Sequence, residues 1–287
     1  MTDQSHKKSK RTAFSGNHQR SWLWGRHAVC ETLLSAKWPV IELFATQFAF
    51  DESSTLLNDK RNEGISVVIV DAARLEQLCR STEHQGLVAR LGEFPYQTMA
   101  TLEHLIHLAI AAQANQNASL SAAATLPPLV VICDRIQDTF NFGAILRCCD
   151  GARVAAVIVG DHAQAEVTPH VARSSSGAVN HIPIVKTQNL LNAAKFAKSL
   201  GLQLVAADAN TKTSVWNSQL RKPTALIIGS EAHGIARDLL SICDQQLCIP
   251  MLGQVTSLNA AVAAGILLYE IRRQQLASII TRAGGDR

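Results

Sequence analysis

A run of small and polar residues near the C-terminus could build a ligand site. The segment Ile249–Asn259 reads IPMLGQVTSLN and leads from an apolar strand end into a stretch with apolar residues at helical spacing. Ser257 is a suitable N-cap for that helix. A polar loop between a strand end and a buried helix leaves backbone donors and acceptors facing a cavity, as at the carboxyl ends of strands in α/β proteins. Taken alone, the segment is equally compatible with a capped core helix after an ordinary loop.

A second segment places a carboxylate between two glycines where another apolar strand stops. It runs from Gly229 to Gly234, reads GSEAHG and contains Glu231. Glycine lets a ligand approach the backbone closely, and a glutamate accepts hydrogen bonds from it. His233 lies beside this carboxylate, but no serine or cysteine nucleophile motif accompanies it, so we interpret it as an ordinary residue. The segment therefore indicates recognition of a ligand by hydrogen bonds.

A third segment combines an asparagine and an arginine after the strand that begins near Leu129. Asn141 is expected to cap a helix that begins near Gly143, and Arg147 then lies about one turn into that helix. Together they could address a phosphate or hydroxyl oxygen. Both also have ordinary interpretations, because asparagine caps are common and a helical arginine is usually solvated.

The elements that would position these residues alternate between strand and helix from Leu129 to the end of the chain. One of the helices opens at Thr168-Pro169, a cap followed by proline in the first turn. Continuous apolar strands separated by helices predict a parallel sheet covered on both faces. No GxGxxG follows the first strand and no Walker P-loop occurs, which disfavours an ordinary dinucleotide or NTP site. The expected strands are Leu129–Cys133, Val154–Val159, Ile182–Val185, Leu202–Ala206, Ala225–Gly229 and Leu247–Ile249.

The N-terminal third reads as a separate, small α/β unit. A helix expected at Thr101–Gln113 follows this unit, and after it the uncharged stretch Ala114–Thr125 suits an interdomain linker. With 287 residues, two domains can each bury a core. We therefore divide the chain into a basic disordered tail (1–20), a small α/β domain (21–97), a helix and flexible linker (98–127) and a C-terminal domain (128–287). Inside the small domain, strands are expected at Ile41–Phe44, Ser66–Val70 and Leu87–Leu91, and helices at Asp51–Asn62 and Asp71–Arg80.

Composition narrows the class of protein. The chain is 47% hydrophobic and 17% charged, and no apolar run reaches the length of a membrane span or forms a signal peptide. We therefore expect a cytoplasmic protein without a membrane partner. The seven cysteines include no CxxC pair, so we expect buried, reduced thiols and no metal site.

The net charge of +4 lies entirely in residues 1–20, which hold five basic side chains and one acidic one. The remaining basic and acidic residues cancel. A basic tail can add salt-dependent phosphate contacts without specifying a sequence, and it is also compatible with a tail that only aids solubility.

Taken together and in order, the three segments resemble the signature motifs of the SpoU/TrmH branch of the SPOUT RNA methyltransferases. The resemblance covers the C-terminal domain nearly end to end. Thr139 stands where this family commonly has proline, which changes the stiffness of the turn but removes no functional group. The matching residues are Asn141-x-Gly143-x-x-x-Arg147, Gly229-x-Glu231-x-x-Gly234, and Ile249-Pro250-Met251 followed by Ser257-Leu258-Asn259.

The resemblance implies a catalytic domain with a deep trefoil knot that holds S-adenosylmethionine between two loops. It implies catalysis by Arg147, Asn141, Glu231, Ser257 and Asn259, and a homodimer through the catalytic domain. Because guanidinium stays protonated, we expect Arg147 to orient the ribose 2′-oxygen and stabilise developing charge rather than act as a base. Methyl transfer from a sulfonium needs no metal. The cofactor-binding residues implied are Gly229, Glu231, Gly234, Ile249, Met251 and Leu258.

The small domain is similar to the N-terminal substrate-binding domain of the same family, which resembles ribosomal protein L-thirty-e in fold. The similarity lies in GRHAV at 25–29 and HQGLVA at 84–89, and it implies RNA binding by Arg26, His27, His84 and Gln85. These signatures are similar to those of RlmB-type enzymes. That similarity implies transfer to the ribose 2′-OH of a guanosine in large-subunit, 23S-type rRNA or a ribosome precursor.

Two alternatives stay open. The chain could methylate tRNA instead, because tRNA-directed members of the group share the signatures. It could also be a non-catalytic RNA-binding or ribosome-assembly protein of the same fold. Such a protein could lose Asn141, Arg147, Glu231 or Asn259, and all four are present.

Overall fold

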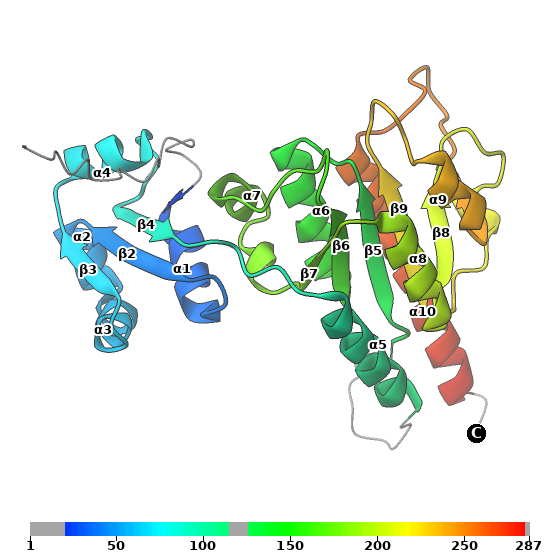
Figure 1. Cartoon of the computed structure of the whole chain (residues 1–287), viewed down its shortest axis with the longest axis horizontal. Helices are drawn as coiled ribbons and strands as arrows, with labels where there is room; N and C mark the ends of the chain where they lie inside the picture. The colour runs from blue at the N-terminus through cyan, green and yellow to red at the C-terminus, as the bar shows by residue number, and fades with distance from the viewer. Residues whose placement is uncertain (1–20, 115–125, 285–287) are drawn as a thin grey trace, which may run out of the picture.

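The computed structural model describes residues 21–114 and 126–284, which form two modules, each built on its own β-sheet (Figure 1). The predicted tail, 1–20, lies outside the described residues, as does the predicted linker apart from Ala114. None of the described helices combines the length and apolar character needed to cross a membrane.

The N-terminal module is a four-stranded mixed sheet in the order β1-β4-β2-β3, in which only β2 and β3 run parallel. The three expected strands are present, and β1 and α1 add to them. The helix expected at Asp51–Asn62 is two helices, because α2 ends at Glu52 and α3 begins at Ser54. In chain order the elements are β1 (Trp22–Trp24), α1 (Arg26–Ser35), β2 (Val40–Ala45), α2 (Gln47–Glu52), α3 (Ser54–Asn62), β3 (Ser66–Ile69), α4 (Ala72–Cys79) and β4 (Leu87–Leu91).

The C-terminal module is a six-stranded sheet in which every strand pair is parallel, in the order β10-β8-β9-β5-β6-β7. This confirms the predicted parallel sheet. The predicted deep trefoil knot is not tested by the strand order and stays a prediction. The strands are β5 (Leu129–Asp134), β6 (Ala156–Gly160), β7 (Ile184–Thr187), β8 (Gln203–Ala207), β9 (Thr224–Gly229) and β10 (Gln245–Leu247).

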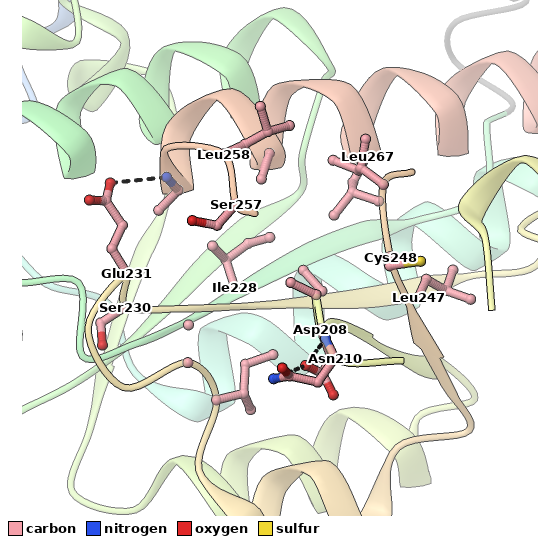
Figure 2. A pocket seen from close by; sticks show the side chains of 18 of the residues that line it. Asp208, Asn210, Ile228, Ser230, Glu231, Leu247, Cys248, Ser257, Leu258 and Leu267 are labelled. Atoms are coloured by element: carbon pink, nitrogen blue, oxygen red, sulfur yellow. Dashed lines mark hydrogen bonds between the residues drawn. The ribbon is translucent and has the colours of Figure 1, made fainter. Parts of the chain in front are cut away.

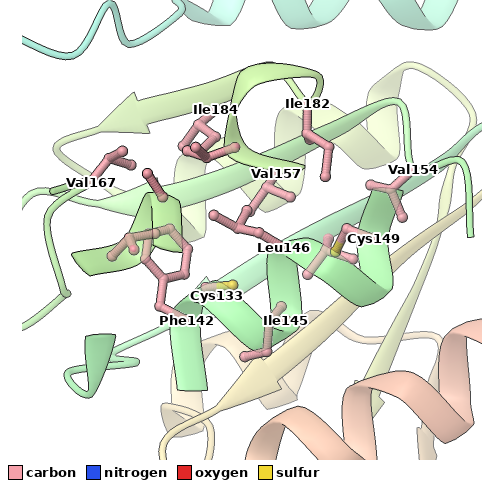
Figure 3. Close-up of a cluster of buried hydrophobic side chains, with 14 of the residues drawn as sticks. Cys133, Phe142, Ile145, Leu146, Cys149, Val154, Val157, Val167, Ile182 and Ile184 are labelled. Atoms are coloured by element: carbon pink, nitrogen blue, oxygen red, sulfur yellow. The ribbon is translucent and has the colours of Figure 1, made fainter. Parts of the chain in front are cut away.

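Helices cover both faces of the parallel sheet because successive residues of each buried strand point to opposite sides. On β5, Val130 and Ile132 pack with α5, α8 and α9, whereas Val131 and Cys133 pack with α6, α7 and α10. Figure 3 shows the second face, where Phe142 of α6 lies among buried side chains of the sheet. The helices are α5 (Met99–Ala114), α6 (Thr139–Gly151), α7 (Pro169–Ser174), α8 (Leu190–Ser199), α9 (Arg237–Ile242) and α10 (Ala260–Gly284), with the short helices η3 (Ala178–Asn180) and η4 (Val215–Asn217).

The chain passes between the modules earlier than expected. Leu102 and Ile106 of α5 are fully buried against the parallel sheet, so α5 belongs to the C-terminal module. The crossing segment is therefore 92–98, in which Gln97 already pairs with Val185 of β7. The stretch beginning at Ala114 instead connects α5 to β5 within one module.

The two modules contact each other through α7 and η3. Arg173 places its guanidinium 4.4 Å from the ring centroid of Trp24 and pairs with Glu83 at 2.9 Å. Nearby, the buried Asn180 donates from Nδ2 to the hydroxyl of Thr32 at 3.1 Å. These contacts hold the N-terminal module against α7 and η3 of the larger module.

The seven cysteines are all free thiols, but only Cys79, Cys133 and Cys149 are buried. The prediction of buried thiols is therefore wrong for the other four, which are partly exposed, and the prediction that the thiols are reduced stays a prediction. Burial raises the pKa of Cys133 to about 12, so this thiol stays protonated at neutral pH.

Candidate functional site

A cavity of about 410 Å³ lies where the carboxyl ends of β8, β9 and β10 meet the first turns of α10 (Figure 2). Parallel strands bring their carboxyl ends to one edge of a sheet, so loops distant in sequence converge there. The lining includes Ser257 and all six residues predicted to bind a cofactor, which are Gly229, Glu231, Gly234, Ile249, Met251 and Leu258.

The loop Gly229–Gly234 closes tightly on itself. The amide of Gly234 donates to the carbonyl of Ser230 at 2.8 Å, and Gly234 adopts a φ of 61°. A Cβ at Gly229 would lie 2.3 Å from the carbonyl carbon of Gly234, so no larger residue fits there without moving the loop. The shape of this turn thus requires glycine at 229 and favours it at 234.

Glu231, on this loop, joins three separate elements. Its Oε1 accepts hydrogen bonds from Asn141 Nδ2 at 3.0 Å, from Asn259 Nδ2 at 2.7 Å and from the amide of Ala260 at 3.1 Å. Asn259 Nδ2 also donates to Asn141 Oδ1 at 2.8 Å. Figure 2 shows Glu231 reaching the beginning of α10. The cluster is open to solvent, so a substrate can approach it.

The structure corrects two predicted helix caps. Asp138, not Asn141, caps α6: its Oδ1 accepts from the amide of Asn141 at 2.7 Å. Asn259, not Ser257, caps α10: its Oδ1 accepts from the amides of Ala261 and Val262. Each helix therefore begins elsewhere than expected. Because Asp138 caps α6, the side chain of Asn141 is not used as a cap and can contact Glu231.

Arg147 does not join this cluster. It is exposed on α6, nearly two turns beyond Asn141, and does not line the cavity. No hydrogen bond or ion pair links its side chain to any part of the chain that the structure describes. It lies on the same helix face as Phe140, seven residues earlier, whose side chain is 70% exposed.

Three of the four predicted RNA-binding residues also make hydrogen bonds within the N-terminal module, and RNA binding by the four stays a prediction. His84 is 7% exposed, and its Nδ1 accepts from the amide of Gly86 at 3.0 Å. Gln85 accepts from the amide of Arg26 at 3.0 Å, and the Arg26 guanidinium pairs with Glu52. Gln85 and the fourth residue, His27, are both exposed, and Arg26 is partly exposed.

The loop after β8 also contributes to the cavity, although no motif in the sequence predicted it. Asp208 and Asn210 line the cavity, and Asp208 Oδ1 accepts from the Asn210 amide at 2.9 Å and from Nδ2 at 3.1 Å. The available signal was a polar pair directly after an apolar strand, at the sheet edge where the other loops meet. Among the described residues that line the cavity, two are carboxylates and none is lysine or arginine. The cavity therefore favours a cationic ligand.

Two family models match the chain. The model described as the SpoU rRNA methylase family matches residues 128–269. The model described as RNA 2′-O ribose methyltransferase substrate binding matches residues 22–97. The matches fall on the two sheets.

Relatives match nearly the whole chain. The 23S rRNA (guanosine-2′-O-)-methyltransferase RlmB of Pasteurella multocida is 32% identical over 257 residues, which cover 89% of this chain and 98% of that protein. A Bacillus subtilis protein named for the TrmH family of tRNA/rRNA methyltransferases is 30% identical over 259 residues, with coverage of 90% and 98%.

Solved structures of SpoU methyltransferases have a similar fold over nearly the whole chain. The SpoU methyltransferase AviRb from Streptomyces viridochromogenes superposes with a TM-score of 0.70 at 24% identity and covers 91% of each chain. AviRb has also been solved in complex with AdoMet, and that structure has the same TM-score at 24% identity, with coverage of 89% of this chain and 90% of that one.

Proposed function

The chain belongs to the SpoU family of RNA 2′-O-ribose methyltransferases, and from this premise we propose that it methylates a guanosine in large-subunit rRNA with S-adenosylmethionine as donor. The observation that carries the proposal is the Glu231 cluster at the rim of the cavity. It places a carboxylate and two amides, from three segments of the chain, where a ribose hydroxyl can meet them.

The cavity suits S-adenosylmethionine in size and polarity. Its volume of about 410 Å³ lies within the ~300–1,000 Å³ of small-molecule sites. Figure 2 shows Ile228, Leu258 and Leu267 around it, an apolar surface against which adenine can pack. The carboxylates of Asp208 and Glu231 suit a cationic ligand, because opposite charges attract across a partly desolvated space. We assign cofactor binding to the six predicted lining residues together with Asp208.

The remaining task of the chain is to position the ribose. Bound S-adenosylmethionine supplies a methyl group that is already activated on a sulfonium. Glu231 Oε2 accepts no hydrogen bond from any described residue, so it is free to accept one from the ribose 2′-hydroxyl. Asn141 and Asn259 hold the same carboxylate through Oε1, and Ser257 lines the same cavity as Glu231. Holding two reactants in line supplies a large part of the reduction in barrier.

We assign to Arg147 the orientation of the 2′-oxygen and its neighbouring phosphate. Its guanidinium is exposed and unpaired within the described chain, and it therefore remains available to bind a phosphate. This role requires that Arg147 meet a bound RNA beside the cluster rather than inside the cofactor cavity.

We further propose a homodimer through the catalytic module. A groove between α6 and α10 is lined mainly by apolar and small residues, among them Ala144, Val262 and Ile266. Phe140 and Tyr269, on the same two helices, are 70% and 58% exposed. A second copy on this face would remove these side chains from water. A monomer in light scattering at micromolar concentration would contradict the proposal.

The rRNA assignment draws on the match of the N-terminal module to a substrate-binding model and on the RlmB relative. His27 and Gln85 are its exposed candidates for RNA contact, and Arg26, which is partly exposed, lies beside them. We propose that the reaction takes place in the cytoplasm, where the enzyme would encounter rRNA and its precursors.

The test is methyl transfer from tritiated S-adenosylmethionine to separate pools of rRNA and tRNA, followed by mapping of the labelled nucleotide. We expect label on a guanosine of large-subunit rRNA, at its ribose. Label in tRNA alone would replace the substrate with tRNA. Label in neither pool would support a non-catalytic RNA-binding protein.

A further inference from the structure

Asp134 and Arg135, at the end of β5, contact the loop after β9. The Asp134 carboxylate is buried; it accepts from Arg135 Nε and Nη2, each at 3.0 Å, and from the amide of Ala236 at 2.7 Å. Arg135 Nη2 also donates to the carbonyl of Gly234 at 3.3 Å. The residues at the end of β5 therefore hold the C-terminal part of the loop after β9, at Gly234 and Ala236.

The backbone of Arg135 explains how two neighbouring side chains can pair. Arg135 adopts a φ of 60°, in the left-handed region that residues with a Cβ seldom occupy. In this conformation the Arg135 guanidinium contacts the carboxylate of the residue that precedes it. A glycine would adopt this backbone more readily, so the arginine is present at a conformational cost. The side chain of Arg135 offsets that cost through its contacts.

The loop after β9 runs from Ser230 to Ala236. Asp134 and Arg135 contact the C-terminal part of this loop, whereas the hydrogen bonds of Glu231 hold its N-terminal part. Glu231 fixes one end of the loop to α6 and α10. At the other end, the Ala236 amide and the Gly234 carbonyl are held by Asp134 and Arg135. Gly234 itself lines the cavity.

We propose that Asp134 and Arg135 form a positioning pair that keeps the loop 230–236 in the shape that binds S-adenosylmethionine. The inference rests on the proposed function, because it concerns the cofactor wall of the same cavity. Arg135 acts through the loop backbone and does not touch the reacting atoms.

The test compares Arg135→Gly with Arg153→Gly. Arg153 is a matched control, because it also has a left-handed backbone, with a φ of 52°, and an exposed side chain. Its side chain makes no hydrogen bond or ion pair with the described residues. Both substitutions relieve the same backbone strain, but only the first removes the contacts with the loop.

The readouts are the Kd for S-adenosylmethionine by calorimetry, the thermal midpoint, and hydrogen exchange of the Ala236 amide without cofactor. For Arg135→Gly we expect the Kd for S-adenosylmethionine to rise about tenfold. A rise of this size follows if the loop adopts its binding conformation only about a tenth of the time. We also expect faster exchange at Ala236 and a lower thermal midpoint, because the buried Asp134 carboxylate loses its partner. For Arg153→Gly we expect a Kd within about twofold of wild type, as for other surface changes.

Wild-type binding is measured first, because it separates the two proposals. No binding by the wild-type protein would overturn the proposed function and this inference with it. Binding by wild type with an equal Kd in Arg135→Gly would overturn the inference alone. So would equal exchange at Ala236 in the two variants. A lowered thermal midpoint with an unchanged Kd would likewise overturn it, because that result describes a purely structural role.

Discussion

Asn259 Nδ2 donates a hydrogen bond to Glu231 Oε1 at 2.7 Å and so joins the residue that caps α10 to the loop after β9. The same asparagine caps the helix through Oδ1 and holds the carboxylate through Nδ2. The orientation of Glu231 therefore depends on where α10 begins.

Glu231→Gln is expected to lower kcat for methyl transfer by about a hundredfold, a loss typical when one oriented polar group is removed from a reacting centre. The amide keeps an acceptor but loses the charge that three donors share. Steady-state assays with rRNA measure the effect. Glu103→Gln, which changes an exposed glutamate of α5, serves as the control and should leave kcat unaltered. Equal kcat in the two variants would remove Glu231 from the proposed site.

Arg147→Ala is expected to abolish methyl transfer while leaving the Kd for S-adenosylmethionine within a few-fold. The reason is that Arg147 lies outside the cavity and has no partner in the described chain to lose. Filter-binding of label and calorimetry measure the two quantities. Arg237→Ala removes another exposed arginine and should retain activity. Near-normal turnover by Arg147→Ala would end the assignment of Arg147 to the reaction.

Gly229→Ala is expected to lower methyl transfer about a hundredfold, the loss that a displacement of about 1 Å can cause in a reacting site. The new Cβ would meet the Gly234 carbonyl carbon at 2.3 Å and the Ile235 nitrogen at 2.5 Å, so the loop must move. At Gly253, a Cβ has no heavy atom within 4 Å. Gly253→Ala should therefore keep wild-type activity. Circular dichroism checks that both variants are folded.

Arg272→Met is expected to lower the free energy of unfolding by about 3 kcal/mol, because it leaves buried acceptors without a donor. Arg272 is buried on α10 and donates to the carbonyls of Ala152, Arg153 and Pro127 at 2.6–2.8 Å. Burial lowers its pKa to about 10, so the side chain is charged at neutral pH. Urea denaturation measures the change.

The control for this variant is Arg237→Met, at an exposed position of α9. It should change the free energy of unfolding by less than about 1 kcal/mol, as most surface substitutions do. A similar loss in both variants would show that the carbonyl contacts of Arg272 contribute little to stability.

The parallel sheet and most helix positions could be predicted because they depend on local periodicity. The runs of apolar residues in β5, β6 and β9 identify strands buried on both faces. Local patterns were less informative where two capping residues lie close together. Asp138 and Asn141 could each cap α6, and Ser257 and Asn259 could each cap α10. The choice depends on packing elsewhere in the fold.

The N-terminal module shows the same limit. His84 and Gln85 carry polar groups suited to RNA, and the structure shows that His84 Nδ1 and Gln85 Oε1 each accept a hydrogen bond from the backbone of the module. A sequence states which side chains could bind a substrate. It does not state which of these side chains will use their hydrogen-bonding atoms to pair with the backbone of the protein itself.

The sequence by itself determined the alternation of strands and helices in the C-terminal module, because this follows from spacing along the chain. It also carried the motifs that resemble the family and the six predicted residues that line the cavity. Only the tertiary structure decided that Glu231, Asn141 and Asn259 share hydrogen bonds, that Arg147 stands apart from them, and that Asp134 and Arg135 hold the loop beside them. The physical reason is that a hydrogen bond needs its atoms within about 3 Å in the right direction. Segments about a hundred residues apart in the chain reach that distance only once the sheet has brought their ends together.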